Sequence, residues 1–231
     1  SIEFMQYGTT RTPNAGDVLR DLTGSLVVLV FGPSGSRLQP DIRRRSLQLA
    51  IFVLILVQLW PLTRSLIDEA ISRHQFPLLS GFQTPFEIER WEGGYRLSVE
   101  PVSPTSTDRF LKLTLTTDEY SGTELKYFDG DWTSARQLKV KFYNPDTTPL
   151  QITCRIHDLQ HSDGNEEYED RYNRSFLLAP GWNPVEIDLD DVKRSPSDRV
   201  MDMSRIRSVM FFAVSLPVSR TVYLDEVRLV Y

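Results

Sequence analysis

The chain has 231 residues, enough for one substantial domain with additional segments, and its 26 basic and 31 acidic side chains give a net charge of −5. Residues 1–80 carry a net charge of +2, whereas residues 81–231 carry −7. The acidic larger part argues against binding to nucleic acid, which requires clustered Lys and Arg. The single cysteine, Cys154, excludes an internal disulfide.

Residues 1–36 are expected to be the end of a bundle of membrane helices. An apolar run, residues 22–31, is interrupted by small residues and follows several charged ones. Charges near a bilayer are costly, so this run alone is a poor membrane span, whereas its small residues suit packing against other helices. The segment also contains, in order, a glutamate, a glutamine, an arginine, an aspartate that would open the final helix, and a glycine: Glu3, Gln6, Arg11, Asp17 and Gly24.

This order of residues resembles the end of the VanZ-like family of membrane proteins, although Asp21 stands where that family usually has an asparagine. The resemblance implies that the chain is the C-terminal part of a VanZ-like inner-membrane protein, a family linked by resemblance to glycopeptide resistance. The structural alternative is that these polar groups cap a helix and pair with one another within the bundle.

Residues 37–80 are expected to form a cytoplasmic loop, a transmembrane helix and a connector. From Leu47 to Leu62 no side chain is charged, and sixteen helical residues reach about 24 Å, slightly short of a hydrocarbon core of about 30 Å. Flanking residues or local thinning of the bilayer could cover the difference. The alternatives are a buried helix of a soluble protein, which rarely stays apolar on every face, and a signal peptide, which would start nearer the N-terminus.

The charges beside this helix predict its orientation. The loop 33–45 carries four arginines and one aspartate, whereas the residues that follow the apolar run balance their charges. The positive-inside rule therefore places the loop in the cytoplasm and residues 81–231 on the periplasmic or extracytoplasmic side of a bacterial inner (cytoplasmic) membrane.

From Phe82 onward the apolar residues recur with a period of two, as in half-buried strands. Four segments show the alternation, and turn-rich clusters separate several of them. In the last segment Val222 and Leu224 have one parity and Val227 and Leu229 the other, which predicts a β-bulge at Asp225–Glu226. The expected fold is mainly β, a jelly-roll β-sandwich over residues 81–231, preceded by two membrane-associated or transmembrane helices.

Four segments of residues 81–231 resemble carbohydrate-binding modules of the galactose-binding-like β-sandwich type: PFEIERW, GDWTSARQLKVKFYNP, GWNPVEIDL and the closing YLDEVRLV. The resemblance implies this fold and glycan recognition, although the sandwich hosts many unrelated functions. Modules of this kind often hold a structural calcium near the first and last strands, with carboxylates and backbone carbonyls as ligands, and Glu87 and Asp225 match those positions in order. No other cofactor is implied.

The segment 155–174 concentrates the side chains that could carry chemistry, and its simplest interpretation is a solvated acidic loop. An EF-hand is excluded because Tyr168 and Arg174 stand where glycine and glutamate are required. A zinc site at His157 and His161, or two carboxylates that hydrolyse a glycosidic bond, needs geometry that the sequence does not provide.

A binding site requires less exact geometry than a metal site or a hydrolytic site. Arg155 and His157 share the outward face of a predicted strand, and sugars are bound on such faces by aromatic rings and planar polar groups. The structural alternative is a buried ion pair between Arg155 and Asp170, or a neighbour of Asp170, that anchors the loop. The predicted ligand-binding residues are Arg155, His157, Asp158, His161, Asp170, Arg171 and Tyr143.

These observations predict a membrane-anchored, non-catalytic module that recognises a cell-envelope or extracellular glycan. Two alternatives remain open. One is a protein–protein interaction module of the cell envelope. The other is a membrane enzyme that modifies envelope glycans or lipids through a bundle mostly outside this sequence.

Overall fold

The computed structural model describes residues 21–28, 41–93, 97–102 and 107–231, and the chain divides into two units, Ser1–Ile67 and Asp68–Tyr231. Of the motif in residues 1–36, only Gly24 falls among the described residues, within a helical stretch at 21–28. Glu3, Gln6, Arg11 and Asp17 lie outside them, as does most of the loop 33–45.

The first unit contains the helical stretch 21–28 and most of helix α3 (Asp41–Gln75). The two helices contact each other, because Gln58 Nε2 donates a hydrogen bond of 2.5 Å to Thr23 Oγ1. On α3, consecutive apolar side chains from Phe52 to Trp60 are mostly exposed rather than gathered on one buried face. In the described part of the chain, one helix, Arg45–Gln75, is long and apolar enough to cross a membrane.

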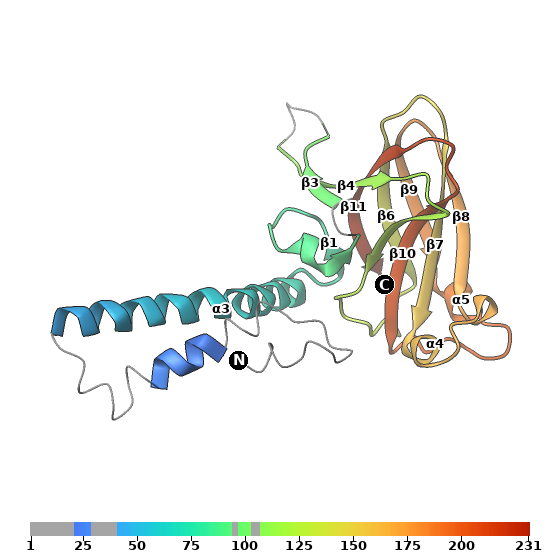
Figure 1. Ribbon diagram of the computed structural model, residues 1–231. Coiled ribbons are helices and arrows are strands. Elements are labelled where there is room, and N and C mark those ends of the chain that lie inside the picture. Colours follow the sequence, from blue (N-terminus) through green and yellow to red (C-terminus); the bar gives the residue numbers. More distant parts are fainter. Residues whose placement is uncertain (1–20, 29–40, 94–96, 103–106) are drawn as a thin grey trace, which may run out of the picture. The chain divides into compact units, whose positions relative to one another are not determined.

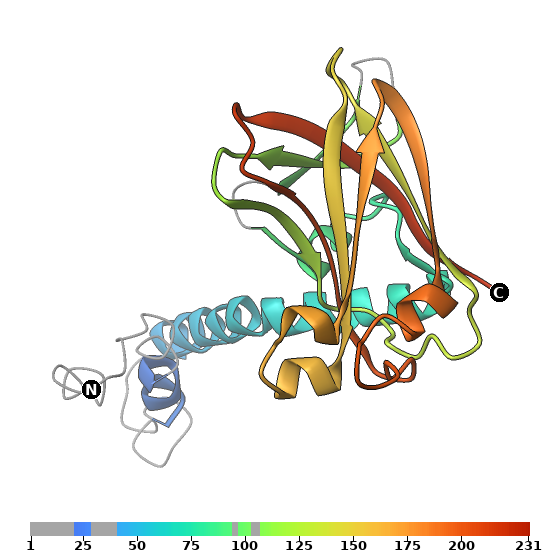
Figure 2. The same ribbon diagram turned by 90° about the vertical axis from the view of Figure 1, so that its right-hand side faces the viewer.

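The second unit is a β-sandwich of two antiparallel sheets (Figures 1 and 2), as the alternating pattern predicts. One sheet has six strands in the order β3-β4-β11-β6-β9, with β1 also paired to β11; the other has five in the order β2-β5-β10-β7-β8. The strands are β1 (Leu78–Ser80), β2 (Trp91–Glu92), β3 (Leu97–Glu100), β4 (Phe110–Leu115), β5 (Tyr120–Leu125), β6 (Gln137–Asn144), β7 (Leu150–Asp158), β8 (Tyr172–Leu178), β9 (Gly181–Asp188), β10 (Ile206–Val214) and β11 (Arg220–Val230).

Short helices connect some of the strands. They are η2 (Glu87–Arg90), α4 (Leu159–Asp163), η4 (Tyr168–Asp170) and α5 (Leu189–Lys193). The second unit begins at Asp68, before the boundary predicted at residue 81. The buried Arg90 side chain pairs with Asp68, Nη2 to Oδ1 at 2.7 Å, and its Nη1 donates to the Leu79 carbonyl at 2.7 Å.

The core lies between the two sheets and uses one face of each strand. On β7, Ile152, Cys154 and Ile156 are fully buried, while Thr153 and Arg155 face away from the core. Because a strand places alternate side chains on opposite faces, this burial confirms the predicted alternation. The predicted bulge is also confirmed, because the β11–β6 register shifts between Asp225 and Arg228 and Glu226 adopts a φ of 47°.

Candidate ligand-binding groove

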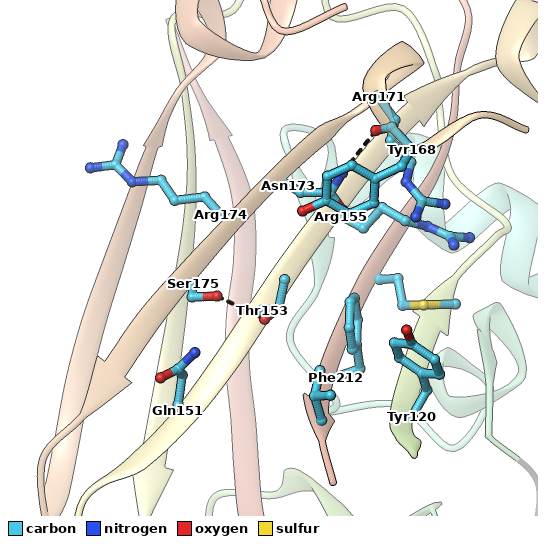
Figure 3. A pocket seen from close by; sticks show the side chains of 12 residues that line it. Tyr120, Gln151, Thr153, Arg155, Tyr168, Arg171, Asn173, Arg174, Ser175 and Phe212 are labelled. Carbon is cyan, nitrogen blue, oxygen red and sulfur yellow. Dashed lines mark hydrogen bonds between the residues drawn. The ribbon is translucent and has the colours of Figure 1, made fainter.

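A groove of about 690 Å³ lies on the outer face of the five-stranded sheet (Figure 3). Strand register brings its side chains together, because Thr153 of β7 stands between Phe212 of β10 and Ser175 of β8. One step along, Arg155 stands between Met210 and Asn173. The lining residues are Tyr120, Gln151, Thr153, Arg155, Tyr168, Arg171, Asn173, Arg174, Ser175, Met210, Phe212 and Val214.

The apolar part of the groove comes from β10 and β5. Phe212 stands opposite Gly122, and a Cβ atom on this glycine would lie 2.4 Å from the Phe212 Cβ and 2.3 Å from the Phe211 carbonyl oxygen. The absence of a side chain at Gly122 therefore lets β10 approach β5 closely. Tyr120 contacts Phe212 edge to face, with ring centroids 5.9 Å apart, and is 63% exposed.

The polar part of the groove comes from β7, β8 and the turn η4. The guanidinium of Arg171 lies over the Tyr168 ring, 5.2 Å from its centroid, and Asn173 Nδ2 donates to the Tyr168 carbonyl at 3.4 Å. Figure 3 shows the guanidinium groups of Arg155 and Arg171 side by side next to Tyr168, whereas Arg174 points away. Tyr168 is 68% exposed, so its ring is free to contact a ligand.

Three buried polar atoms of this wall lack a hydrogen-bond partner among the described residues: Arg155 Nε, Arg171 Nε and Asn173 Oδ1. Buried polar groups are normally paired, and an unpaired one costs about 1–3 kcal/mol. These three atoms have almost no solvent-accessible surface, so a ligand in the groove reaches them only if the side chains reorient on binding. The wall therefore has hydrogen-bonding capacity that the protein itself does not use.

Arg199 holds the loop that carries Tyr168 and Arg171. Its guanidinium pairs with Asp158, Nη1 to Oδ2 at 2.6 Å and Nη2 to Oδ1 at 2.8 Å, and with Asp170, Nε to Oδ1 at 2.5 Å. These bonds lower the pKa of Asp170, and they lower the pKa of Asp158 despite the opposing effect of burial. The paired carboxylates in turn raise the pKa of Arg199.

Asp158 also connects the strand to the helix that follows it. It caps helix α4 by accepting from the His161 backbone N–H at 3.1 Å, and it accepts from the Asp202 backbone N–H at 2.7 Å. This network fixes the end of β7 and the beginning of β8 relative to each other.

The predicted ligand-binding residues lie in three places: in the groove, in the buried region beside it, and on the other sheet. Arg155 and Arg171 both line the groove. His157, Asp158 and His161 are buried beside it, and Asp170 is partly buried, with its carboxylate bound to Arg199 and to His161 Nδ1, the latter at 3.3 Å. The alternative ion pair between Arg155 and Asp170 is not present, because Arg199 takes that role.

The rings of the two buried histidines are tilted towards each other, with ring centroids 4.7 Å apart and an angle of 42° between their planes. Burial, together with the charges of Arg155, His161 and Arg171, lowers the pKa of His157 to about 3, so its ring is neutral near pH 7. The described residues contain no group of three His, Cys, Asp or Glu side chains placed to hold a metal ion, and the zinc alternative gains no third ligand here.

Tyr143 belongs to the other sheet. It stands on β6 between Trp182 of β9 and Tyr223 of β11, with ring centroids 5.1 Å and 6.1 Å away. Trp182 is 49% exposed, so the three rings form an aromatic surface on the outer face of the six-stranded sheet. Tyr143 therefore cannot act together with Arg155 in one site.

Of the two residues predicted to bind calcium, Glu87 does not fit that role. Glu87 is buried, and its two oxygens accept four hydrogen bonds, from the backbone N–H groups of Gly81, Phe82 and Thr84 and from the Thr84 hydroxyl, at 2.6 to 3.0 Å. All four acceptor sites of the carboxylate are thus occupied. Burial raises the pKa of the Asp225 carboxyl to about 6. Its role as a calcium ligand stays a prediction.

Sequence reasoning missed Tyr120, Asn173, Met210 and Phe212 in the groove and Arg199 behind it. One feature of the sequence could have indicated that β10 contributes side chains to the groove. Its run Val209–Val214 is apolar at both parities, so this strand carries apolar side chains on its outer as well as its inner face.

The known proteins that match this chain are similar to it in fold. No protein-family model and no curated protein sequence matches the chain, so the resemblance of residues 1–36 to VanZ-like proteins gains no support. Among solved structures, an agarase matches with 16% identity and a TM-score of 0.50 over 66% of this chain and 25% of the agarase chain.

Carbohydrate-binding modules also match. The family 11 module from Clostridium thermocellum, solved with a β-1,3-1,4-mixed-linked tetrasaccharide, gives 17% identity and a TM-score of 0.48 over 66% of this chain and 94% of its own. A module specific for non-crystalline cellulose, CBM28, gives 11% identity and a TM-score of 0.46 over 68% of this chain and 93% of its own. At such identities the similarity describes the sandwich fold.

Proposed function

We propose that this protein is a non-catalytic glycan-binding module and that the sugar lies in the groove on the outer face of the five-stranded sheet. The fold alone leaves the function open, because sandwiches host many activities. The observation that supports the proposal is the groove itself: exposed tyrosine rings stand beside arginine and asparagine groups that have unused hydrogen-bonding capacity.

The shape and the chemistry of the groove suit a sugar chain. A sugar ring has apolar faces that pack on aromatic rings and hydroxyl groups that need donors and acceptors in fixed directions. Tyr120 and Tyr168 offer such rings, and the guanidinium forks and the Asn173 amide offer the polar partners. An adjoining hollow of about 240 Å³ shares Tyr120, Met210 and Phe212 with the groove, so the binding surface continues across β5.

Binding is a better interpretation than hydrolysis. Glycoside hydrolysis uses a pair of carboxyl groups on either side of the scissile bond. The described residues that line the groove include no Asp or Glu, and the nearby Asp158 and Asp170 are held by Arg199. In the adjoining hollow, Glu92 and Glu124 lie within 2.7 and 3.6 Å of Lys126 Nζ.

We also propose that helix Arg45–Gln75 anchors the module in a bacterial inner membrane and that the sandwich lies outside the cytoplasm. Its exposed apolar side chains support the first part of this proposal, and the arginine-rich loop 33–45 supports the second. The ligand would then be a glycan of the cell envelope or of the extracellular medium.

A binding panel tests the proposed function. The full chain would be placed in lipid nanodiscs, since detergents with sugar head groups could compete for the groove, and titrated with neutral and acidic polysaccharides. We expect saturable binding to at least one polysaccharide, which a Phe212→Asp variant with an intact fold should lose. Failure of every polysaccharide to bind would contradict the proposal.

A further inference from the structure

Arg155 and Arg171 place two positive charges together on one wall of the groove. Both side chains are half-buried, and their guanidinium groups point to the same side (Figure 3). Burial and the nearby Arg155 charge lower the pKa of Arg171 from its usual value, as expected when like charges share a site with little water. The free protein therefore holds an unfavourable electrostatic arrangement.

No carboxylate among the described residues forms an ion pair with either arginine. The other half-buried arginines that the structure describes in this unit are paired, Arg199 with Asp158 and Asp170 and Arg220 with Asp146. Glu166 attracts the Arg171 charge but does not form an ion pair with it. Across the sheet, Glu124 accepts from Ser208 at 2.5 Å and pairs with Lys126. The whole of residues 81–231 is acidic, so the unpaired cations form a local exception to its charge.

We infer that the groove selects an acidic glycan, one whose sugar carries a carboxylate or a sulfate ester, and that Arg155 and Arg171 bind this anionic group together. The inference rests on the proposed function and adds the chemical class of the ligand. An anion between the two guanidinium groups relieves their repulsion and accepts charge-assisted hydrogen bonds from both of them.

The surrounding residues complete the site. Tyr168 holds the Arg171 guanidinium from one face, so the donor edge of the fork remains available. Asn173 stands opposite Arg155 on the neighbouring strand and lines the groove beside it. The apolar floor at Met210 and Phe212 lies next to these groups and packs against the ring of the same sugar.

Two matched pairs of polysaccharides test the inference on the full chain in nanodiscs. Dextran sulfate is compared with dextran, and polygalacturonate with its methyl ester, so that only the charged group differs within each pair. We expect at least one charged polysaccharide to bind tenfold or more tightly than its neutral counterpart, and the pair that responds distinguishes sulfate from carboxylate. Equal binding of charged and neutral members would overturn the inference while leaving the proposed function intact. Absence of all binding would overturn both.

Variants then locate the effect. Arg155→Gln and Arg171→Gln should each weaken binding of the charged polysaccharide at least tenfold, equivalent to about 1.4 kcal/mol. Arg228→Gln removes the same charge from an exposed position on β11 of the other sheet and should bind as the wild type. An equal loss in Arg228→Gln would mean non-specific attraction and overturn the inference.

Thermal unfolding of each variant would be measured in parallel. Arg155→Lys and Arg171→Lys retain the charge without the fork, and they replace any glutamine variant that fails to fold. Removal of one of two repelling charges should leave the melting temperature unchanged or raise it. A large fall in melting temperature together with unchanged affinity in the lysine variants would overturn the inference.

Discussion

Arg199 and Asp158 form a two-point ion pair across 41 residues of sequence, with Nη1–Oδ2 and Nη2–Oδ1 distances of 2.6 and 2.8 Å. The Asp158 side chain is completely buried, and the same guanidinium also binds Asp170 beside the groove. The geometry of the binding wall, with Tyr168 and Arg171 on it, thus depends on a residue that does not line the groove.

Replacement of Arg199 by alanine should therefore destabilise the protein strongly. Removal of one partner leaves a buried carboxylate without its counter-charge, which typically costs about 3–5 kcal/mol. Arg199→Lys should recover part of the loss, since lysine keeps the charge but cannot reproduce the fork. Equilibrium unfolding in urea measures both variants. A loss below about 1 kcal/mol in Arg199→Ala would show that the network does not hold the loop.

His157 makes stability depend on pH. Its pKa is about 3 in the folded protein and near 6.5 in an unfolded chain, so between these values the unfolded chain binds more protons. The free energy of unfolding should be fully maintained above pH 6.5 and fall as the pH drops towards 3, by about 2 kcal/mol between pH 7 and pH 5.

His157→Gln should reduce this slope, and His74→Gln, a change at an exposed histidine of α3, serves as the control. Urea unfolding across this pH range measures the slope. The role assigned to His157 would be refuted by identical slopes in the wild type and His157→Gln. Asp158 and Asp170 act at lower pH, because their lowered pKa values mean that stability is lost only as the pH falls through about 4 and below.

Gly122→Ala should destabilise the five-stranded sheet. The new Cβ would lie 2.3 Å from a backbone oxygen of β10, so the two strands would have to separate. Forced overpacking of this kind typically costs about 1–3 kcal/mol, and here it would also displace Phe212 from the groove. Denaturant unfolding measures the stability, and titration with the bound glycan measures the groove. A variant as stable as the wild type would mean that the close approach of β5 and β10 is unnecessary.

The proposed topology predicts where reporters are active. A reporter that works only in the cytoplasm should be silent when fused after Tyr231 and active when fused within the loop 33–45. Exchange of Arg43, Arg44 and Arg45 for glutamine should weaken this preference. Strong cytoplasmic activity of the fusion after Tyr231 would place the sandwich inside the cell and contradict the proposed anchoring.

Local periodicity was sufficient for much of the fold. Alternation in β7 predicted that Ile152, Cys154 and Ile156 point inward and Arg155 outward, and a change of parity predicted the bulge near Glu226. These predictions succeed because strand geometry relates neighbouring residues directly. The alternation places Arg155 on the outer face of β7, but it does not show which residues of other strands lie beside it.

The rest of the site depends on contacts between distant segments. Tyr143 has suitable chemistry, but strand order puts β6 in the opposite sheet from β7. His157 has the outward parity of Arg155, yet it is buried and its ring contacts that of His161 on helix α4. Arg199 comes 41 residues after Asp158, and no sequence period connects them. Each of these placements is decided by tertiary packing, which a single sequence does not reveal.

The most direct test of the proposed groove removes its two exposed tyrosine rings. Tyr120 and Tyr168 are 63% and 68% exposed, so a Tyr120→Ala/Tyr168→Ala double variant should unfold within about 0.5 kcal/mol per site of the wild type. Calorimetric titration of the full chain in nanodiscs with the polysaccharide that binds most tightly should then show about 30-fold weaker binding, if each ring contributes about 1 kcal/mol. Tyr127→Ala, which removes a ring that is 61% exposed but lies outside the groove, should bind as the wild type. Wild-type affinity in the double variant would contradict glycan binding in this groove.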